Sequence, residues 1–159
     1  MNKTGLILQN EKFNLALCEL NKLEKDRKFC KHDITHLIEV ARIMLKINRT
    51  ENLDIEHDLI IATSLLHDLG RVNQYKFNID HRVGGKEIIT TILKECTFNK
   101  EEIDKILEAI SLHKTSSSNQ LADLLYRADI LSRPCYLCKM KNECYWDNSI
   151  KNKRYYNWK

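Results

Sequence analysis

The sequence predicts an all-α protein. It contains only four glycines and one proline in 159 residues, too few for the many tight turns of a β-sandwich or barrel. Apolar residues recur every three or four positions over most of the chain, which is typical of amphipathic helices. Hydrophobic residues make up 43% of the chain and charged residues 30%, the balance of a soluble globular protein. We therefore expect a bundle of about six helices over residues 1–134, followed by an irregular cysteine-containing C-terminal segment, residues 135–159.

Three of the six helices are predicted in the first half of the chain. Apolar residues at roughly helical spacing indicate a helix over residues 6–27. Asp33 has the side chain of an N-cap and starts a second helix that runs to about Ile47. Asp54 is expected to cap a third helix, whose apolar run indicates burial and which ends at the stop residue Gly70.

The other three helices follow after a turn. One is expected from about His81 to Cys96. The next spans residues 99–113 and opens with an asparagine and a glutamate three residues apart, a pair that resembles a capping box. The last runs from about residue 119 to residue 132 and stops at Pro134.

The chain has no sequence signal for a membrane or for export. No stretch approaches the roughly 18 apolar residues that a membrane span requires. Residues 1–13 turn polar after a short apolar run, unlike a signal peptide. We therefore expect a cytoplasmic protein whose six cysteines stay reduced. In that compartment, clustered cysteines are interpreted first as metal ligands.

Several histidines and aspartates occur at helix ends or on apolar faces, where solvated side chains are not expected. His67 and Asp68 follow the apolar run 62–66, so both side chains start from a buried wall. A buried carboxylate is costly unless it is paired or bound to a metal. Asp129 repeats the problem within the apolar stretch 124–131. Imidazole and carboxylate together suit Zn, Mn, Fe or Ni better than Ca or Mg.

Together with His36, these residues resemble the H…HD…D signature of the HD-domain metal-dependent phosphohydrolases. His36, His67-Asp68 and Asp129 occur in the order of that family, each on a separate predicted helix, and the likeness runs over about residues 30–133. The resemblance implies an all-α HD-domain bundle that hydrolyses a nucleotide or another small phosphate ester. It also implies a divalent transition metal ion (Fe, Mn, Ni or Zn) held by His36, His67, Asp68 and Asp129.

Two more histidines resemble those of the binuclear branch of this family, which includes hydrolases similar to the symmetrical dinucleoside tetraphosphatases. His81 opens the sequence His81-Arg82-Val83-Gly84-Gly85, and His113 closes a predicted helix. The resemblance implies that both hold a second ion, with Asp68 bridging the two; the alternative is that they are packing residues. Two such ions can activate a hydroxide nucleophile and neutralise charge at the attacked phosphorus.

Further roles are assigned around the reaction. Asp68 could orient the nucleophile or take its proton. Arg71, just beyond the metal motif, and Lys114 are placed to hold phosphate oxygens, and the alternative makes both of them ordinary surface bases. His57 lies in a charged first turn and is expected to be solvated. His32 either lines the mouth of the site or merely precedes the helix cap.

Three cysteines, Cys135, Cys138 and Cys144, lie within ten residues after the helix-stopping proline. Their spacing resembles the last three ligands of the [4Fe–4S] loops in helix-hairpin-helix DNA glycosylases. The first ligand of that pattern is missing, and Cys30 is the candidate for it because it stands at a helix entry. The element Phe29-Cys30-x-His32-Asp33 together with a three-cysteine tail also resembles a subgroup of small bacterial HD proteins.

The cysteine ligands leave the identity of the centre open. Four thiolates also bind zinc, so a [4Fe–4S] cluster is the first hypothesis, zinc the second and unligated cysteines the third. Arg133, Lys139 and Lys141 could offset the thiolate charge. Cys18 and Cys96 lie in amphipathic helices and are predicted to be small core residues.

Two other classes of function are weighed against an enzyme. One is a non-catalytic nucleotide or redox sensor with a degenerate pocket, against which the complete ligand set argues. The other is a nucleic-acid-binding module. Residues 133–159 contain seven basic and two acidic side chains, a net charge of +5, interleaved with aromatic residues. A solvated tail whose aromatic residues pack on the domain is the favoured interpretation of this segment.

Overall fold

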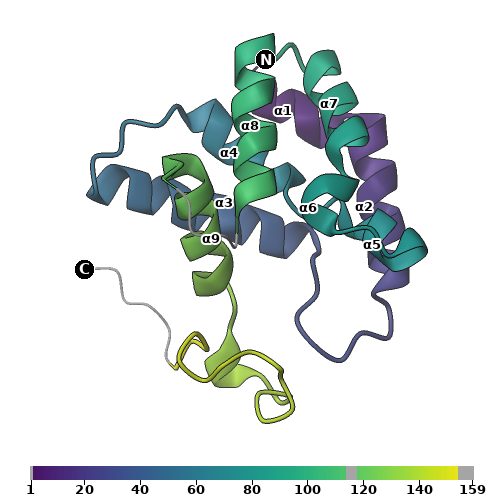
Figure 1. Cartoon of the computed structure of the whole chain (residues 1–159), viewed down its shortest axis with the longest axis vertical. Coiled ribbons are helices and arrows are strands. Elements are labelled where there is room, and N and C mark those ends of the chain that lie inside the picture. Colours follow the sequence, from purple (N-terminus) through teal and green to yellow (C-terminus); the bar gives the residue numbers. More distant parts are fainter. Residues whose placement is uncertain (1, 114–117, 154–159) are drawn as a thin grey trace.

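The structure, a computed structural model, describes residues 2–113 and 118–153 and confirms the all-α class (Figure 1). Within these ranges the chain forms helices and no strand, and none of the helices is long and apolar enough to cross a membrane. The elements are α1 (Lys3–Gln9), α2 (Glu11–Leu23), α3 (Ile34–Thr50), α4 (His57–Leu66), α5 (Arg71–Phe77), α6 (His81–Gly84), α7 (Lys86–Glu95), α8 (Lys100–Leu112), α9 (Gln120–Leu131) and the 3-10 helix η1 (Cys135–Leu137).

The single helix predicted over residues 6–27 is wrong, because two helices, α1 and α2, meet at Asn10. The Asn10 side chain accepts a hydrogen bond from the backbone N–H of Phe13, while its own N–H donates to the carbonyl of Ile7. An asparagine side chain competes with the helical hydrogen-bond ladder and favours caps. Asn10 therefore ends one helix and starts the next without interrupting the apolar spacing.

Other boundaries also differ from the prediction. Asp54 does not cap α4, since it has a left-handed φ of 57° and Glu56 occupies the N-cap position. The helix predicted over residues 81–96 is divided at Gly85 into α6 and α7. The short α5 was not predicted because none of its seven residues is buried, so it carries no apolar stripe. Asp33, in contrast, caps α3 as predicted by accepting from the His36 N–H.

The core lies between α3, α4, α8 and α9, with α3 crossing the bundle beside α4 and α9 (Figure 1). α4 is buried along nearly its whole length, which explains its continuous apolar run. Fully buried aliphatic residues line all four helices, and each contributes roughly 1.5–3 kcal/mol relative to exposure. The packing fixes the ends of these helices, where the polar residues singled out above are found.

The turn after α4 requires a glycine because two backbones approach each other closely there. Gly70 has a φ of −62°, so it is not the left-handed helix stop that the sequence predicted. A Cβ at Gly70 would lie 1.9 Å from the carbonyl oxygen of His81 and 2.8 Å from the nitrogen of Gly85. The missing side chain lets α6 begin directly against the turn that carries His67 and Asp68.

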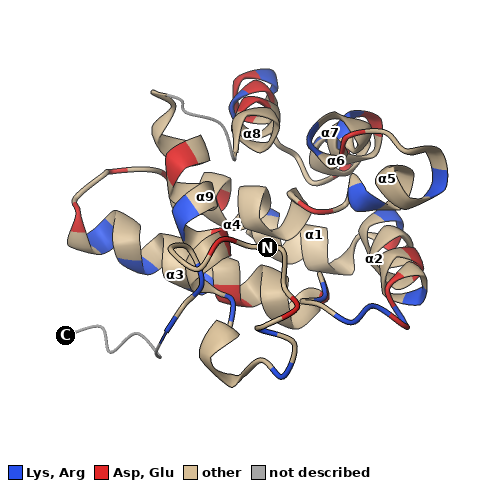
Figure 2. Ribbon diagram, turned by 60° about the horizontal axis from the view of Figure 1, so that its bottom comes forward, with Lys and Arg blue, Asp and Glu red and all other residues tan. Residues whose placement is uncertain are grey.

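The C-terminal segment folds against the loop that joins α2 to α3. Arg133 Nη1 donates to the carbonyl of Lys31 at 2.8 Å, and the ring of Tyr145 meets that of Phe29 edge to face. The Asn152 side chain donates to the Arg133 carbonyl at 2.6 Å and ties the segment back to the end of α9. The ribbon in Figure 2 is coloured for Lys and Arg along both the loop and the segment, and the Arg133–Lys31 contact brings these two basic stretches together.

Candidate metal centre and adjoining cysteine cavity

Two histidines and two aspartates from three parts of the bundle meet in its interior. His36 lies in the first turn of α3, Asp129 near the end of α9, and His67 and Asp68 in the turn after α4. His36 Nε2 is 3.3 Å from Asp129 Oδ1 and 3.4 Å from Asp68 Oδ2. His67 Nε2 is 2.9 Å from Asp68 Oδ2, and all four side chains are buried. One ligand atom each of His36, His67 and Asp129 lies within 4.8 Å of the other two, close enough to share an ion.

Hydrogen bonds at Nδ1 aim two of the histidine rings. His67 Nδ1 donates to the carbonyl of Ser64, and His113 Nδ1 donates to the carbonyl of Ile110, each at 2.7 Å. Because a carbonyl only accepts, Nδ1 carries a proton, and Nε2 is the ring nitrogen left to face a metal. Metal-ligating histidines are held in this way by an outer acceptor. The backbone therefore sets both the tautomer and the direction of these rings.

The charges at the centre fit a bound cation. Burial alone would raise the pKa of Asp68, but the neighbouring positive groups, His67 first, hold it well below its usual range. Burial of Asp129 is likewise outweighed by its contact with His36, and the pKa of Asp129 is lowered. Within the described residues, His67 Nε2 and Asp68 Oδ2 are buried without a hydrogen-bond partner. Carboxylate oxygens and imidazole nitrogens are the donors that a divalent transition metal takes, and both are present in this buried place.

Five histidine rings form a continuous line through the site. Neighbouring rings meet edge to face with centroids 5.5–5.8 Å apart. The order along the line is His32, His36, His67, His113 and His81. The structure thus brings His81, at the start of α6, and His113, at the end of α8, to the far side of His67 from His36.

Two arginines reach the same centre. Arg71 Nε donates to Asp68 Oδ1 at 2.6 Å, beside the metal motif as its sequence position indicated. Arg133 is buried, and its Nη2 lies 3.4 Å from Asp129 Oδ1. The sequence analysis placed Arg133 only with the cysteines, although its i+4 spacing from Asp129 on one helix face could have revealed the contact. Lys114 lies outside the described residues.

A buried glutamate beside the centre was missed altogether. Glu24 follows the last residue of α2, is 1% exposed, and has Oε1 2.5 Å from Nδ1 of His32. Nothing in the local sequence distinguishes Glu24 from the many solvated acidic residues of a charged helix end. His32 itself is 3% exposed and lines the cavity next to the centre. His57, by contrast, is exposed, as expected.

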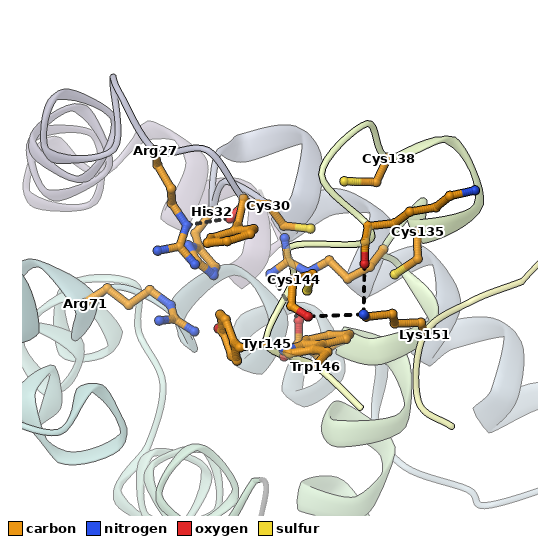
Figure 3. Close-up of a pocket in the computed structure, with 14 residues that line it drawn as sticks. Arg27, Cys30, His32, Arg71, Cys135, Cys138, Cys144, Tyr145, Trp146 and Lys151 are labelled. Atoms are coloured by element: carbon orange, nitrogen blue, oxygen red, sulfur yellow. Dashed lines mark hydrogen bonds and ion pairs between the residues drawn. The ribbon is translucent and has the colours of Figure 1, made fainter. Parts of the chain in front are cut away.

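One cavity connects the metal centre to the cysteines (Figure 3). Its walls include Asp129 and His32 at one end and Cys30, Cys135, Cys138 and Cys144 at the other. In Figure 3 the four cysteines surround a common space between the α2–α3 loop and the C-terminal segment. Burial raises the pKa of the Cys30 thiol, Arg133 lowers it, and each of the other three cysteines raises it further. The structure therefore brings all four cysteines together.

The spacing of these thiols is wider than a zinc site. Within the described ranges, no three of the four sulfur atoms all lie within 4.8 Å of one another. Tetrahedral zinc with Zn–S bonds of ~2.3 Å brings its sulfur ligands to within ~3.8 Å of each other. Of the remaining cysteines, Cys96 is buried in the core as predicted, whereas Cys18 is exposed and the prediction of a core position for it is wrong.

Comparison with known proteins identifies the family. Residues 33–135 match the family model described as HD domain. This range is more than half of the chain and includes His36, His67, Asp68 and Asp129. The chain therefore belongs to the HD-domain family, whose members bind divalent metal ions, as the resemblance of the motifs implied.

Two relatives add to this assignment. An uncharacterized protein of Clostridium beijerinckii is 40% identical over 156 residues, which cover 98% of this chain and 99% of that protein. A crystal structure of a predicted HD superfamily hydrolase from an uncultured Thermotogales bacterium matches 95% of this chain and 87% of its own, with a TM-score of 0.63 and 24% identity. The second likeness shows that the fold is shared.

Proposed function

We propose that the protein is a metal-dependent phosphohydrolase that acts on a small phosphate ester, with a nucleotide as the first candidate. The observation that carries this proposal is the buried convergence of His36, His67, Asp68 and Asp129 in a chain of the HD-domain family. The hydrolase named for the Thermotogales structure agrees with it. The complete ligand set favours an enzyme over a degenerate sensor.

The proposed ligands divide between two ions. His36, His67, Asp68 and Asp129 hold the first. His81 and His113, together with Asp68, would hold the second, and their place in the line of histidine rings supports this role. The mixed nitrogen and oxygen donors favour Fe, Mn, Ni or Zn. Such ions polarise a phosphoryl group and lower the pKa of water.

The protein side chains bind and orient the reactants. Asp68 is kept ionised by its positive neighbours, so it can orient an attacking water or accept its proton. Arg71 holds Asp68 through Nε and reaches the cavity, where its remaining N–H groups can donate to phosphate oxygens. We propose that Lys114 also binds phosphate oxygens.

The cavity also supports an accessory [4Fe–4S] centre on Cys30, Cys135, Cys138 and Cys144. A [4Fe–4S] cluster is usually held by four thiolates, and the four cysteines line one cavity. Zinc remains the alternative that metal analysis distinguishes. Such a centre would tie the C-terminal segment, residues 135–159, to the bundle of residues 1–134, and the reducing cytoplasm would keep its thiols available.

A panel of substrates tests the proposed activity. The protein is purified without oxygen, loaded with Fe, Mn, Ni or Zn, and mixed with nucleoside mono-, di- and triphosphates, dinucleoside polyphosphates and a generic aryl phosphate. We expect phosphate release or nucleotide cleavage with at least one substrate, retained in the Asp104→Ala variant, which changes an exposed aspartate of α8. No turnover with any metal, together with salt-sensitive binding of DNA or RNA, would favour the nucleic-acid-binding alternative.

A further inference from the structure

Glu24 is a buried carboxylate that does not belong to the metal centre. Its Oε2 accepts from the backbone N–H of His32 at 2.8 Å, and its Oε1 accepts from His32 Nδ1 at 2.5 Å and from the Tyr75 hydroxyl at 2.7 Å. Burial would raise the pKa of Glu24, but the contacts with His32 outweigh it and lower the pKa to about 2. An ionised carboxylate in the interior is destabilising unless it is paired. The three hydrogen bonds that stabilise Glu24 therefore indicate that it has a specific role.

The task of Glu24 is to fix the ring of His32. Because the carboxylate holds Nδ1, the orientation of the ring is fixed, and so is the direction in which Nε2 points. Nε2 lies 4.0 Å from Asp68 Oδ2, and the ring rests edge to face on His36. The distance between His32 Nε2 and Asp68 Oδ2 is too long for a hydrogen bond. His32 also lines the cavity, so Nε2 faces the place where a reactant next to Asp68 would lie.

Two guanidinium groups flank His32 in the same cavity wall. Arg27 Nε donates to the Cys30 carbonyl and Nη1 to the Tyr75 hydroxyl, so Tyr75 links Arg27 to the glutamate. Arg71 donates through Nε to Asp68. In the part of the chain that the structure describes, Nη2 of neither arginine has a hydrogen-bond acceptor. Figure 3 shows both guanidinium groups and the His32 ring directed into the cavity.

The other positive charges of the cavity are already engaged. Arg133 Nη2 lies 3.0 Å from His36 Nε2 and 3.4 Å from Asp129 Oδ1, and Lys151 Nζ donates to the backbone carbonyls of Lys141 and Cys144. Arg27 and Arg71 lie beside His32 (Figure 3). Two forked donors, together with an imidazole nitrogen that accepts from a protonated phosphate oxygen, form a set that a phosphate group can take.

We propose that His32, Arg27 and Arg71 form a phosphate subsite on the cavity side of the metal centre, with Glu24 as its positioning residue. The inference rests on the proposed phosphohydrolase function and adds to it how the substrate lies. Its phosphate accepts from the two Nη2 groups, and a protonated phosphate oxygen donates to His32 Nε2.

Binding of inorganic phosphate to the metal-loaded full-length protein tests the subsite. Isothermal titration gives the phosphate affinity, and metal analysis of the same samples gives the number of ions. We expect His32→Ala and Arg27→Ala each to weaken phosphate binding by about tenfold or more at unchanged metal content, since each removes a hydrogen bond with the phosphate. His57→Ala, the matched change of an exposed histidine, leaves both values unchanged.

Two conservative variants test the positioning role. Glu24→Gln and Tyr75→Phe retain the size of each side chain but alter the support of His32. We expect weaker phosphate binding in both variants and, with a substrate, a higher KM at a nearly constant kcat. A purely structural role would lower the thermal midpoint without this split between KM and kcat. Circular dichroism confirms that each variant is folded before it is titrated.

The outcomes separate the subsite from the function on which it rests. Unchanged phosphate affinity in folded His32→Ala protein overturns the subsite, and so does metal loss in that variant, because His32 would then be a metal ligand. A wild-type protein that binds metal but no phosphate also overturns the subsite. A wild-type protein that binds no metal overturns the proposed phosphohydrolase itself.

Discussion

The metal centre and the cysteine end of the cavity adjoin each other, yet the chain builds them in different ways. The proposed metal ligands stand at the ends of α3, α4 and α9, which the core packs together, and backbone carbonyls hold the His67 and His113 rings. The cysteines lie on η1 and on loops, where Cys135 is buried and Cys138 and Cys144 are half-buried. The buried apolar cluster of the described residues includes Cys96 but none of these cysteines, so we expect the order of the second region to depend on what the thiols bind.

From this contrast we infer that the packing of the helices organises the metal centre, whereas a bound ligand organises the cysteine end. Removing a ligand residue from the metal centre should abolish function and leave the fold in place. Removing one from the cysteine end should loosen the C-terminal segment itself. The experiments that follow test this difference, beginning with the largest expected effect.

Asp68→Ala is expected to abolish hydrolysis, with a loss of at least about 1,000-fold, and to lower bound metal, because Asp68 is proposed to contact both ions. The far-ultraviolet circular dichroism should stay helical, since the surrounding helices are held by apolar packing. Activity and metal content are measured on the same sample, with Asp104→Ala as the control. Full activity in Asp68→Ala would refute the proposal that this site catalyses hydrolysis.

Cys30→Ser is expected to bleach the broad absorption of a [4Fe–4S] centre near ~400 nm or to make it sharply sensitive to oxygen. Absorption of anaerobic protein and limited proteolysis are the measurements, and the C-terminal segment should become susceptible while the bundle stays resistant. Cys18→Ser, which changes an exposed cysteine, serves as the control. Colourless wild-type protein with stoichiometric zinc would reject the cluster, and an unchanged Cys30→Ser variant would reject the fourth ligand.

Gly70→Ala tests how rigidly the fold holds the metal turn. The new Cβ would lie 1.9 Å from the His81 carbonyl oxygen, so we expect a loss of ~3 kcal/mol or more in the free energy of unfolding. Gly84→Ala is the matched control, because there the nearest atom is 3.2 Å away and the residue is helical. Urea denaturation measures both variants. Equal stability of the two would show that the turn is as adaptable as the cysteine loops.

His81→Ala and His113→Ala are each expected to reduce bound metal towards half, leaving the first ion in place. The second ion would lose a ligand, whereas His36, His67 and Asp129 still converge on the first. Elemental analysis of protein loaded under identical conditions gives the stoichiometry. Wild-type metal content in both variants would make these histidines packing or substrate residues and the site mononuclear.

We expect low pH to weaken the hydrogen bonds between His32 and Glu24. The pKa of Glu24 is about 2 in the folded protein against an ordinary value of 4.5, so its contribution to stability is present above 4.5 and is lost as the pH falls towards 2. The stability difference between wild type and Glu24→Gln should therefore shrink over this range. Denaturation at pH 7, 4 and 2.5 measures it. A difference that stays constant would contradict an ionised Glu24.

Sequence reasoning reached the proposed ligand residues because their place next to apolar runs makes them conspicuous. A histidine and an aspartate after a run of apolar residues cannot be ordinary surface side chains, and the order of His36, His67-Asp68 and Asp129 indicated the family that the comparisons confirm. Cys30 was paired with the distant tail on the same kind of argument, and the structure brings it to the other cysteines. These residues carry their own signal in the sequence.

Residues that act through contacts distant in sequence carried no such signal. Glu24 resembles any acidic residue at a helix end, and only the packing of α2 against α5 reveals its pairing with His32 and Tyr75. The break between α1 and α2 was missed because apolar spacing continues across Asn10. The role of Gly70 was misassigned because a helix stop and a close backbone approach both favour glycine.

The central claim is that the buried histidine and aspartate group is a metal-dependent catalytic site. The most direct test adds metal stepwise to metal-free protein and follows product formation from a substrate found in the panel. The account predicts that activity rises with bound metal, levels off when the proposed ligands are filled, and stays at background in Asp68→Ala at every metal concentration. Turnover that is already complete without metal, or is equal in Asp68→Ala, would contradict it.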